Sequence, residues 1–255
     1  MTGLLEGKCA LVTGGGSGIG RATSIAMGRE GARVTVADLS EAGAAETAAH
    51  IRAAGGEAQF VVVDVTKADQ VETMVAAAVS AFGRLDCAHN NAGIAAANVG
   101  AGGQRVGDIS QAAWDRLIAV NLTGVWLCMK HELAAMERHG SGAIVNTSSI
   151  AGLVGLPGSH AYVAAKHGVI GLTKAASIDH AEAGIRVNAV CPGYIDTPLV
   201  GEAMTRRGAQ ILSTVPMRRL GLAEDIAEAV VWLCSDRSGF VTGATLTVDG
   251  GYTAG

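Results

Sequence analysis

Short apolar runs alternate with longer stretches of helical spacing along the whole chain. The short runs predict buried strands, because each is bounded by glycine, proline or an acidic residue. The longer stretches carry apolar residues at helical spacing and predict helices. The predicted strands are residues 8–12, 33–37, 58–63, 85–89, 143–147, 186–191 and 244–248. The predicted helices are residues 21–30, 41–54, 68–82, 110–138 with an interruption at 121–124, 160–181, 202–212 and 223–234.

Strands that alternate with helices are typical of parallel strands joined by right-handed crossovers. The pattern therefore predicts an α/β fold, a single doubly wound Rossmann domain over residues 1–255, with helices on both faces of a parallel seven-stranded sheet. No linker divides the chain. We expect residues 198–216, which are flanked by prolines, to form a small insertion that covers a substrate. Residues 94–108 are rich in Ala and Gly without a period, so we expect a mobile loop there, with its segment 95–107 shaping the site.

Composition narrows the classes of partner. The formal net charge is −4, only 16% of residues are charged, and no run of Lys and Arg occurs. This balance argues against nucleic acid or an anionic membrane as the partner and leaves a small molecule. No apolar run approaches the roughly 18 residues that span a bilayer, and residues 1–8 lack the pattern of an export signal. We expect a soluble, cytoplasmic protein.

The five cysteines are widely spaced and lie mostly in apolar surroundings. No C-x-x-C or H-x-x-x-H pair is present, and the seven histidines form no ligand cluster. The cysteines are therefore interpreted as core thiols, and no metal site is expected.

A glycine-rich turn, TGGGSGIG, occupies residues 13–20 between the first predicted strand and the first predicted helix. At that position backbone N–H groups and the helix dipole can receive a pyrophosphate. The spacing is T-G-x-x-x-G-x-G rather than the strict G-x-G-x-x-G. Taken alone, the turn could also be an ordinary connection between a strand and a helix.

Acidic residues follow the second and third predicted strands. Asp38 stands where an acid hydrogen-bonds the ribose 2′-OH of an adenine dinucleotide, and its charge would repel a 2′-phosphate. Neither Ser17 nor Leu39 is basic, so NAD is favoured over NADP. Asp38 could also serve as a helix N-cap. Asp64, with Val65, could contact the adenine edge or be a simple loop acid.

Tyr162 and Lys166 stand four residues apart and therefore share one face of the predicted helix. An adjacent ammonium would stabilise the Tyr162 phenolate and lower its pKa toward neutrality, as a general base requires. Ser149, at the end of the fifth predicted strand, offers a hydroxyl to a substrate oxygen. Y-x-x-x-K alone is common as a surface pair, so the prediction depends on its combination with the glycine turn.

Together these motifs resemble the short-chain dehydrogenase/reductase family. The resemblance covers nearly the whole chain, from KCALVTGGGSGIG through NNAG, NTSS, YVAAK and RVNAVCPGYIDTP to VDGG. It implies that Tyr162 is the general acid/base, that Lys166 lowers its pKa and holds the nicotinamide ribose, and that Ser149 orients the substrate oxygen. It also implies that Asn121 is the fourth catalytic residue, which holds a kinked helix and a water that links the lysine to solvent. The implied cofactor-binding residues are Gly14, Ser17, Gly18, Ile19, Gly20, Asp38, Leu39, Asp64, Val65, Asn91, Ala92, Gly93, Tyr162, Lys166, Pro192, Gly193, Ile195 and Thr197.

The resemblance further implies an NAD-dependent oxidoreductase that interconverts a secondary alcohol, cyclic or diol-type, and its ketone. Similar proteins include dehydrogenases of cyclic alcohols and cis-diols and those named glucose 1-dehydrogenases. Two alternatives stay open: a 3-oxoacyl-thioester reductase, which Asp38 disfavours because such enzymes typically use NADPH, and a cofactor-binding protein without catalysis. Relatives of this length commonly form homotetramers, although the apolar segments involved could equally be monomer core.

Two local alternatives also stay open. Ser148 and Ser149 compete for one role, and the spacing from Tyr162 favours Ser149. His160 could hydrogen-bond a substrate hydroxyl or face solvent at a helix N-terminus.

Overall fold

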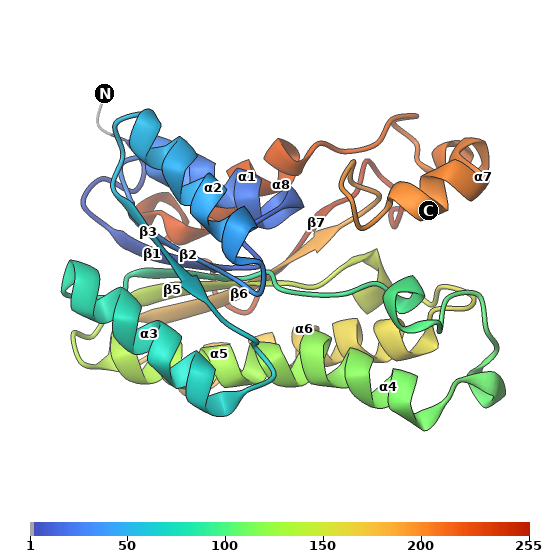
Figure 1. Cartoon of the computed structure of the whole chain (residues 1–255), viewed down its shortest axis with the longest axis horizontal. Coiled ribbons are helices and arrows are strands. Elements are labelled where there is room, and N and C mark those ends of the chain that lie inside the picture. Colours follow the sequence, from blue (N-terminus) through green and yellow to red (C-terminus); the bar gives the residue numbers. More distant parts are fainter. Residues whose placement is uncertain (1–2) are drawn as a thin grey trace.

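Seven parallel strands form one sheet in the computed structural model, which describes residues 3–255 (Figure 1). The strand order is β3-β2-β1-β4-β5-β6-β7. The strands are β1 (Cys9–Thr13), β2 (Arg33–Asp38), β3 (Ala58–Val62), β4 (Cys87–Asn90), β5 (Gly142–Thr147), β6 (Ile185–Pro192) and β7 (Thr245–Val248). Every predicted strand is present, with ends that differ by two residues or fewer. Residues 1 and 2 of the predicted domain lie outside the described residues.

Helices cover both faces of the sheet (Figure 1). One face packs against α1 (Gly18–Arg29), α2 (Glu41–Ala53) and α8 (Ala223–Cys234), and the other against α3 (Ala68–Phe82), α5 (Gly124–Glu137) and α6 (His160–Asp179). A separate apolar cluster lies on each side, so the sheet is buried on both faces. Burial on both faces explains why the central strands are continuous apolar runs rather than alternating ones.

The strand order reverses between β1 and β4, and parallel register aligns the carboxyl ends of the central strands. Thr13 pairs with both Ala37 and Asn90, and Asn90 pairs with Asn146. In doubly wound sheets a ligand binds outside the carboxyl ends at such a reversal. The fold thus brings the glycine turn and the NNAG turn to one edge.

The long helical stretch after residue 110 is interrupted where the sequence predicted. Helix α4 (Gln111–Ile118) begins after Ser110, whose hydroxyl accepts a hydrogen bond from Ala113 N at 3.2 Å and so caps the helix. A π-helical turn, Ala119–Thr123, then separates α4 from α5. Such turns are frequent at functional sites because they re-aim a side chain.

Two predictions need correction. Helix α1 begins at Gly18 rather than at residue 21, because the glycines that lower helix propensity are needed for close packing. Residues 94–108 are not wholly irregular: two 3₁₀ turns, Ala96–Val99 and Val106–Asp108, lie there. The side chains of Ala96 and Ala101 are buried against α4 and α6, so part of the segment belongs to the core.

Helix α7 (Gly201–Thr214) is longer than the predicted 202–212 and lies beyond the carboxyl ends of the strands (Figure 1). All five cysteines are buried, which agrees with their assignment as core thiols. Within residues 3–255, no group of three or more candidate ligands could hold a metal ion. No helix in the same part of the chain has the length and apolar character that crossing a membrane requires.

Candidate active site

A cavity of about 780 Å³ opens at the carboxyl ends of the strands. It is lined by the glycine turn after β1, by the residues that follow β2 to β6, and by α7 and the C-terminal segment. All but two of the predicted site residues line it. The two exceptions are Gly20 and Asn121, which are buried behind the cavity wall.

The glycine turn is shaped by close backbone contacts. Gly14 and Gly18 have φ angles of 64° and 49°, which favour glycine, and a Cβ at Gly14 would lie 2.9 Å from Ala92 Cα. A Cβ at Gly20 would collide with the Gly14 carbonyl oxygen. Gly20 therefore serves close packing of the helix on the turn rather than direct contact with a ligand.

The N-terminus of α1 points into this cavity without an acidic competitor. Ser17 is the N-cap, its side chain makes no capping hydrogen bond, and the first turn contains no acidic residue. The free N–H groups and the positive end of the helix dipole suit the pyrophosphate of a dinucleotide. The cradle left by the glycines fits the same group.

Asp38 is fixed by two backbone donors. Its Oδ2 accepts a hydrogen bond from Gly16 N, and its Oδ1 accepts one from Ser40 N, both at 2.8 Å. The alternative that Asp38 is the N-cap of α2 is wrong, because Ser40 is the N-cap and accepts from Gly43 N. Asp38 is instead held against the glycine turn at the cavity wall.

Asp64 and Val65 also line the cavity. The Asp64 Oδ1 atom accepts hydrogen bonds from Thr66 N at 3.0 Å and from Thr66 Oγ1 at 2.7 Å. Burial alone would raise the pKa of Asp64, but the Thr66 hydrogen bonds outweigh it and the pKa is lowered. Asp64 therefore presents a fixed carboxylate near the far end of the cavity.

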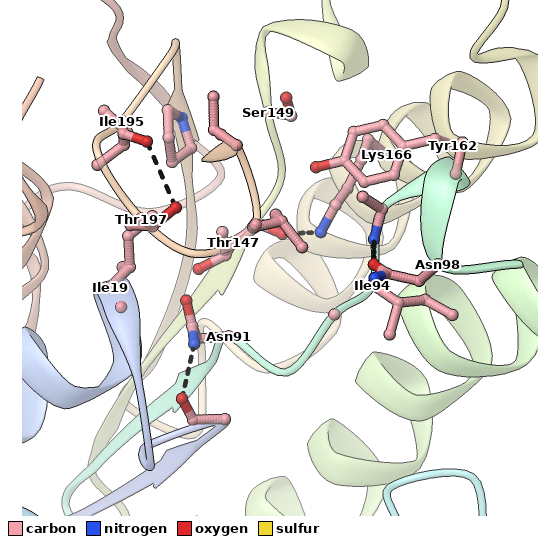
Figure 2. Close-up of a pocket in the computed structure, with 18 of the residues that line it drawn as sticks. Ile19, Asn91, Ile94, Asn98, Thr147, Ser149, Tyr162, Lys166, Ile195 and Thr197 are labelled. Carbon is pink, nitrogen blue, oxygen red and sulfur yellow. Dashed lines mark hydrogen bonds between the residues drawn. The ribbon is translucent and has the colours of Figure 1, made fainter. Parts of the chain in front are cut away.

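The NNAG turn closes the floor of the cavity against the glycine turn (Figure 2). Asn91 Nδ2 donates to the carbonyl oxygens of Thr13 and Gly14 at 3.2 and 3.3 Å. In return, Thr13 Oγ1 accepts hydrogen bonds from the backbone N–H groups of Asn91 and Ala92. These reciprocal bonds make the two turns one rigid unit.

Tyr162 and Lys166 lie one turn apart on α6 and face the cavity together (Figure 2). Lys166 Nζ lies 5.7 Å from the centre of the Tyr162 ring and donates to the Thr147 carbonyl oxygen at 2.8 Å. Burial lowers the pKa of Lys166 to about 8. At neutral pH the lysine is therefore mostly an ammonium, and it is held beside the tyrosine.

The pKa of Tyr162 does not follow the sequence-based expectation. We expected Lys166 to lower it; the structure gives a raised pKa. Burial of the phenol is the largest cause, since it disfavours the charged phenolate, and the hydrogen bond with Ser149 opposes it. In this environment Tyr162 is a protonated phenol at neutral pH.

The two adjacent serines have different environments. Ser148 Oγ donates to the Lys166 carbonyl oxygen at 2.8 Å, so its proton is committed to the backbone. Ser149 Oγ accepts from Ala151 N at 3.1 Å, which leaves its own proton free to donate. Figure 2 places the Ser149 hydroxyl beside the Tyr162 ring, at the same side of the cavity.

Asn121 lies in the π-helical turn and is completely buried. Its Oδ1 accepts from Ile94 N at 2.8 Å and its Nδ2 donates to Ile94 O at 2.9 Å. A Cβ at Gly93 would lie 3.0 Å from Asn121 Oδ1 and 3.8 Å from Lys166 Nζ, so the glycine leaves room between them. The side chain anchors the segment that follows the NNAG turn.

The remaining walls are mostly apolar. Tyr194 and Tyr252 meet edge to face with ring centres 5.7 Å apart, and both line the cavity. Residues from 198–216 also line it. The apolar members of these walls are Ile150, Leu156, Leu199, Val200 and Ile211.

His160 has a different role from both alternatives. Its Nε2 is 2.9 Å from the Gln104 carbonyl oxygen, it is half-buried, and it does not line the cavity. It fastens the segment 95–107 to the start of α6, together with a hydrogen bond from Gly103 N to Gly158 O at 3.0 Å.

The sequence reasoning missed Tyr194 and Tyr252. Only their positions in the sequence indicated a place in the cavity wall: Tyr194 follows the Pro-Gly break after β6, and Tyr252 follows the glycines after β7. Both breaks lie at the carboxyl edge of the sheet, so aromatic residues directly after them were candidates for the cavity wall.

A glycine turn at a sheet reversal, an acid at the end of β2, and a Tyr-Lys-Ser group in one cavity define a nicotinamide-dependent oxidoreductase. Comparison with known proteins agrees. The family model described as "Enoyl-(Acyl carrier protein) reductase" matches residues 14–253. The chain belongs to the short-chain dehydrogenase/reductase family.

Two curated relatives cover nearly the whole chain. The cis-4-hydroxycyclohexanecarboxylate dehydrogenase of Sinomonas cyclohexanicum is 47% identical over 97% of both chains. The cyclohexanol dehydrogenase of Acinetobacter sp. (strain SE19) is 42% identical over 100% of this chain and 98% of the relative. The crystal structure of levodione reductase superposes with a TM-score of 0.93 at 36% identity, over 98% of this chain and 99% of that one. The chain is therefore an oxidoreductase that interconverts a secondary alcohol and its ketone, with a nicotinamide cofactor and a small-molecule substrate.

Proposed function

We propose that this chain is an NAD-dependent dehydrogenase of a cyclic secondary alcohol or diol. One observation carries the proposal: the Tyr162 ring and the Ser149 hydroxyl share a largely apolar cavity that continues to the glycine turn and Asp38. A ring alcohol at the apolar end would present its oxygen to Tyr162 and Ser149. A dinucleotide would fill the remainder.

The nicotinamide, when bound, accepts the hydride in oxidation and returns it in reduction. Tyr162 takes the hydroxyl proton in oxidation and gives it back in reduction. Ser149 accepts from Ala151 N and donates its own proton to the same substrate oxygen. Lys166 holds the cofactor's ribose.

Asn121 completes the proposed group without touching the cavity. By binding the backbone N and O atoms of Ile94, it holds the turn in which Gly93 leaves room between Asn121 and Lys166. A water in that room would carry the proton from Lys166 toward solvent. Asn121 acts here as a positioning residue.

The proposed cofactor is NAD rather than NADP. Asp38 is held by Gly16 N and Ser40 N, so its charge stays at the cavity wall. A 2′-phosphate would meet this carboxylate, while a 2′-OH could donate to it. Leu39 directly after it is apolar and exposed. Asp64 and Val65 are proposed to contact the adenine.

The remaining cofactor contacts are proposed for residues around the same cavity. Ser17, Gly18 and Ile19 offer the helix N-terminus to the pyrophosphate, and Asn91, Ala92 and Gly93 support the dinucleotide from behind. The segment after β6 would contact the nicotinamide amide and its phosphate through Pro192, Gly193, Ile195 and Thr197.

The cyclic substrate is supported by the cavity and by the relatives. The substrate end is built from aliphatic side chains and the Tyr194–Tyr252 pair, which suits a compact apolar ring. Both curated relatives described above act, by name, on substituted or simple cyclohexanols. The 3-oxoacyl-thioester reductase alternative gains no support from Asp38, whose charge disfavours NADPH.

We also propose that residues 3–255 fold as one domain in which 198–216 covers the substrate, and that the enzyme is a homotetramer. The large apolar side chains of Trp126, Ile178, Trp232 and Phe240 are exposed, and burial between subunits would remove them from water. A cytoplasmic location stays a prediction.

The proposal is tested by initial rates on a panel of alcohols. Cyclohexanol and a cis-cyclohexanediol should be oxidised with NAD⁺ faster than an acyclic secondary alcohol of equal carbon number, and faster than with NADP⁺. A 3-hydroxyacyl thioester with NADP⁺ serves as the rival reaction. Preference for the thioester and NADP⁺ would reject the proposed function.

A further inference from the structure

Glu132 is a buried carboxyl that the proposed chemistry does not use. It lies on α5 with none of its surface exposed, and its Oε2 accepts a hydrogen bond from Asn90 Nδ2 at 2.8 Å. No ion pair to Glu132 is found within residues 3–255. A buried carboxylate without a cation is costly, so its protonation state needs an explanation.

A chain of hydrogen bonds fixes the orientation of the Asn90 amide. Thr173 Oγ1 donates to Val169 O, so it can accept from Asn146 Nδ2 at 3.0 Å. Asn146 Oδ1 then accepts from Asn90 Nδ2 at 3.0 Å. Both protons of Asn90 Nδ2 are therefore used, one toward Asn146 and one toward Glu132.

Asn90 Oδ1 and Glu132 Oε1 are among the buried side-chain atoms that have no hydrogen-bond partner in the described part of the chain. These two oxygens belong to groups already joined by one hydrogen bond. Both are acceptors if Glu132 is ionised, so neither can satisfy the other. A single proton on Glu132 Oε1 would satisfy both.

We propose that Glu132 is a neutral carboxylic acid that donates from Oε1 to Asn90 Oδ1 while its Oε2 accepts from Asn90 Nδ2. The two hydrogen bonds form a closed acid–amide pair that fastens the end of β4 to α5. Asn90 is the first residue of the NNAG turn, whose Asn91, Ala92 and Gly93 line the cavity. Glu132 is thus a positioning residue for the turn that supports the cofactor.

The surroundings of Glu132 favour the neutral acid. Burial raises the pKa of Glu132 to about 7, opposed by the hydrogen bond from Asn90. On its own helix, burial and Glu132 hold the pKa of the Cys128 thiol well above the ordinary value, so the thiol is uncharged. On β4, burial and the charge of Lys166 lower the pKa of His89 to about 3, so this imidazole is neutral.

Among the described residues, no other element packed against α5 brings a charged side chain into hydrogen-bond contact with Glu132. β5 contributes Asn146 and α6 contributes Thr173, and neither titrates. The buried face of α3 consists of apolar residues. The competing arrangement is a buried water that donates to both oxygens while Glu132 is ionised.

Infrared spectroscopy separates the two arrangements. The difference spectrum of wild type minus Glu132→Gln, at about pH 6, should contain the carbonyl stretch of a protonated carboxylic acid. The matched control Glu72→Gln removes an exposed carboxylate from α3 and should give only carboxylate bands. Absence of the acid band in the first spectrum would overturn the proposal in favour of the water.

Thermal unfolding gives an independent readout. A carboxyl whose folded pKa lies above its unfolded value of about 4.3 gives stability that is complete at low pH and is lost as pH rises to the folded pKa. Glu132→Gln has no such titration, and its amide can mimic the acid. The Tm of Glu132→Gln relative to wild type should therefore rise by at least about 5 °C between about pH 5 and about pH 8. A pH-independent difference would contradict the proposal.

A third test, by steady-state kinetics, rests on the proposed function. Glu132→Leu, which cannot accept from Asn90, should raise the KM for NAD⁺ at least about tenfold with a smaller change in kcat, and Glu132→Gln should restore the KM. An unchanged KM in Glu132→Leu would overturn the positioning role. Lack of turnover in the wild type itself would instead reject the proposed function, and the infrared and unfolding results would stand apart from it.

Discussion

Asp38 accepts a hydrogen bond from Gly16 N at 2.8 Å and thereby joins the end of β2 to the glycine turn after β1. The contact is tight, since a Cβ at Gly16 would lie 2.9 Å from Asp38 Oδ2. One carboxylate thus shapes the turn and sets the charge at the cavity wall. The proposed recognition of the ribose and the support of the turn would therefore be coupled through this residue.

Replacing Asp38 should change the choice of cofactor. The double variant Asp38→Ser, Leu39→Arg removes the repelling charge and adds a cation, so the ratio of kcat/KM for NADP⁺ to that for NAD⁺ should rise at least about tenfold, equivalent to about 1.4 kcal/mol. Asp64→Asn, which removes a different carboxylate from the same cavity, should leave this ratio near its wild-type value. An unaltered ratio in the double variant would refute the role of Asp38.

Gly20 should tolerate no side chain, although it does not line the cavity. Gly20→Ala puts a Cβ against the Gly14 carbonyl oxygen and should cost about 3 kcal/mol of unfolding free energy. Gly171→Ala is the matched control, because nothing lies within 4 Å of its Cβ position on α6, and it should stabilise by roughly 0.5–1 kcal/mol. Chemical denaturation measures both, and equal effects at the two glycines would count against the packing argument.

Replacing Tyr252 should change the KM for the substrate rather than the KM for the cofactor. Tyr252→Leu loses the edge-to-face contact with Tyr194, worth about 1 kcal/mol, so the KM for a ring alcohol should rise about three- to tenfold. The KM for NAD⁺ should stay within about twofold. Tyr252→Phe keeps the ring and should behave as wild type. If the KM for NAD⁺ rose instead, the aromatic pair would belong to the cofactor end.

The two reaction directions should depend on pH in opposite ways. Burial raises the pKa of Tyr162, so the phenolate that oxidation needs is scarce at neutral pH and grows about tenfold for each pH unit below that pKa. Oxidation should therefore accelerate toward alkaline pH, while ketone reduction, which needs the phenol, should not. Profiles of kcat in both directions from about pH 6 to about pH 9 test this, and an oxidation rate independent of pH would argue against Tyr162 as the base.

The sheet could be predicted because its central strands are buried on both faces and form apolar runs between glycines and acids. Helix α1 could not be placed to the residue, because Gly18 and Gly20 satisfy tertiary contacts at the expense of helix propensity. β6 extends one residue beyond the prediction to Pro192, since a final residue needs no N–H donor within the ladder.

The candidate site was predicted in part. Residues that follow strand ends were found, because parallel topology carries strand ends to one edge. The roles of Ser148 and His160 could not be predicted, because each is set by one hydrogen bond to a distant backbone atom, which no local pattern encodes. The buried pair of Asn90 and Glu132 was missed for the same reason: the residues are far apart in the sequence and meet only when α5 packs on β4.

The most direct measurement compares wild type with Tyr162→Phe in NADH formation from cyclohexanol and NAD⁺. The variant keeps the ring beside Lys166 and lacks only the hydroxyl, so NAD⁺ binding measured by fluorescence should be retained. Its kcat should fall at least about 100-fold, as expected for loss of a general acid/base. Turnover within about tenfold of wild type, with NAD⁺ bound equally well, would contradict the account.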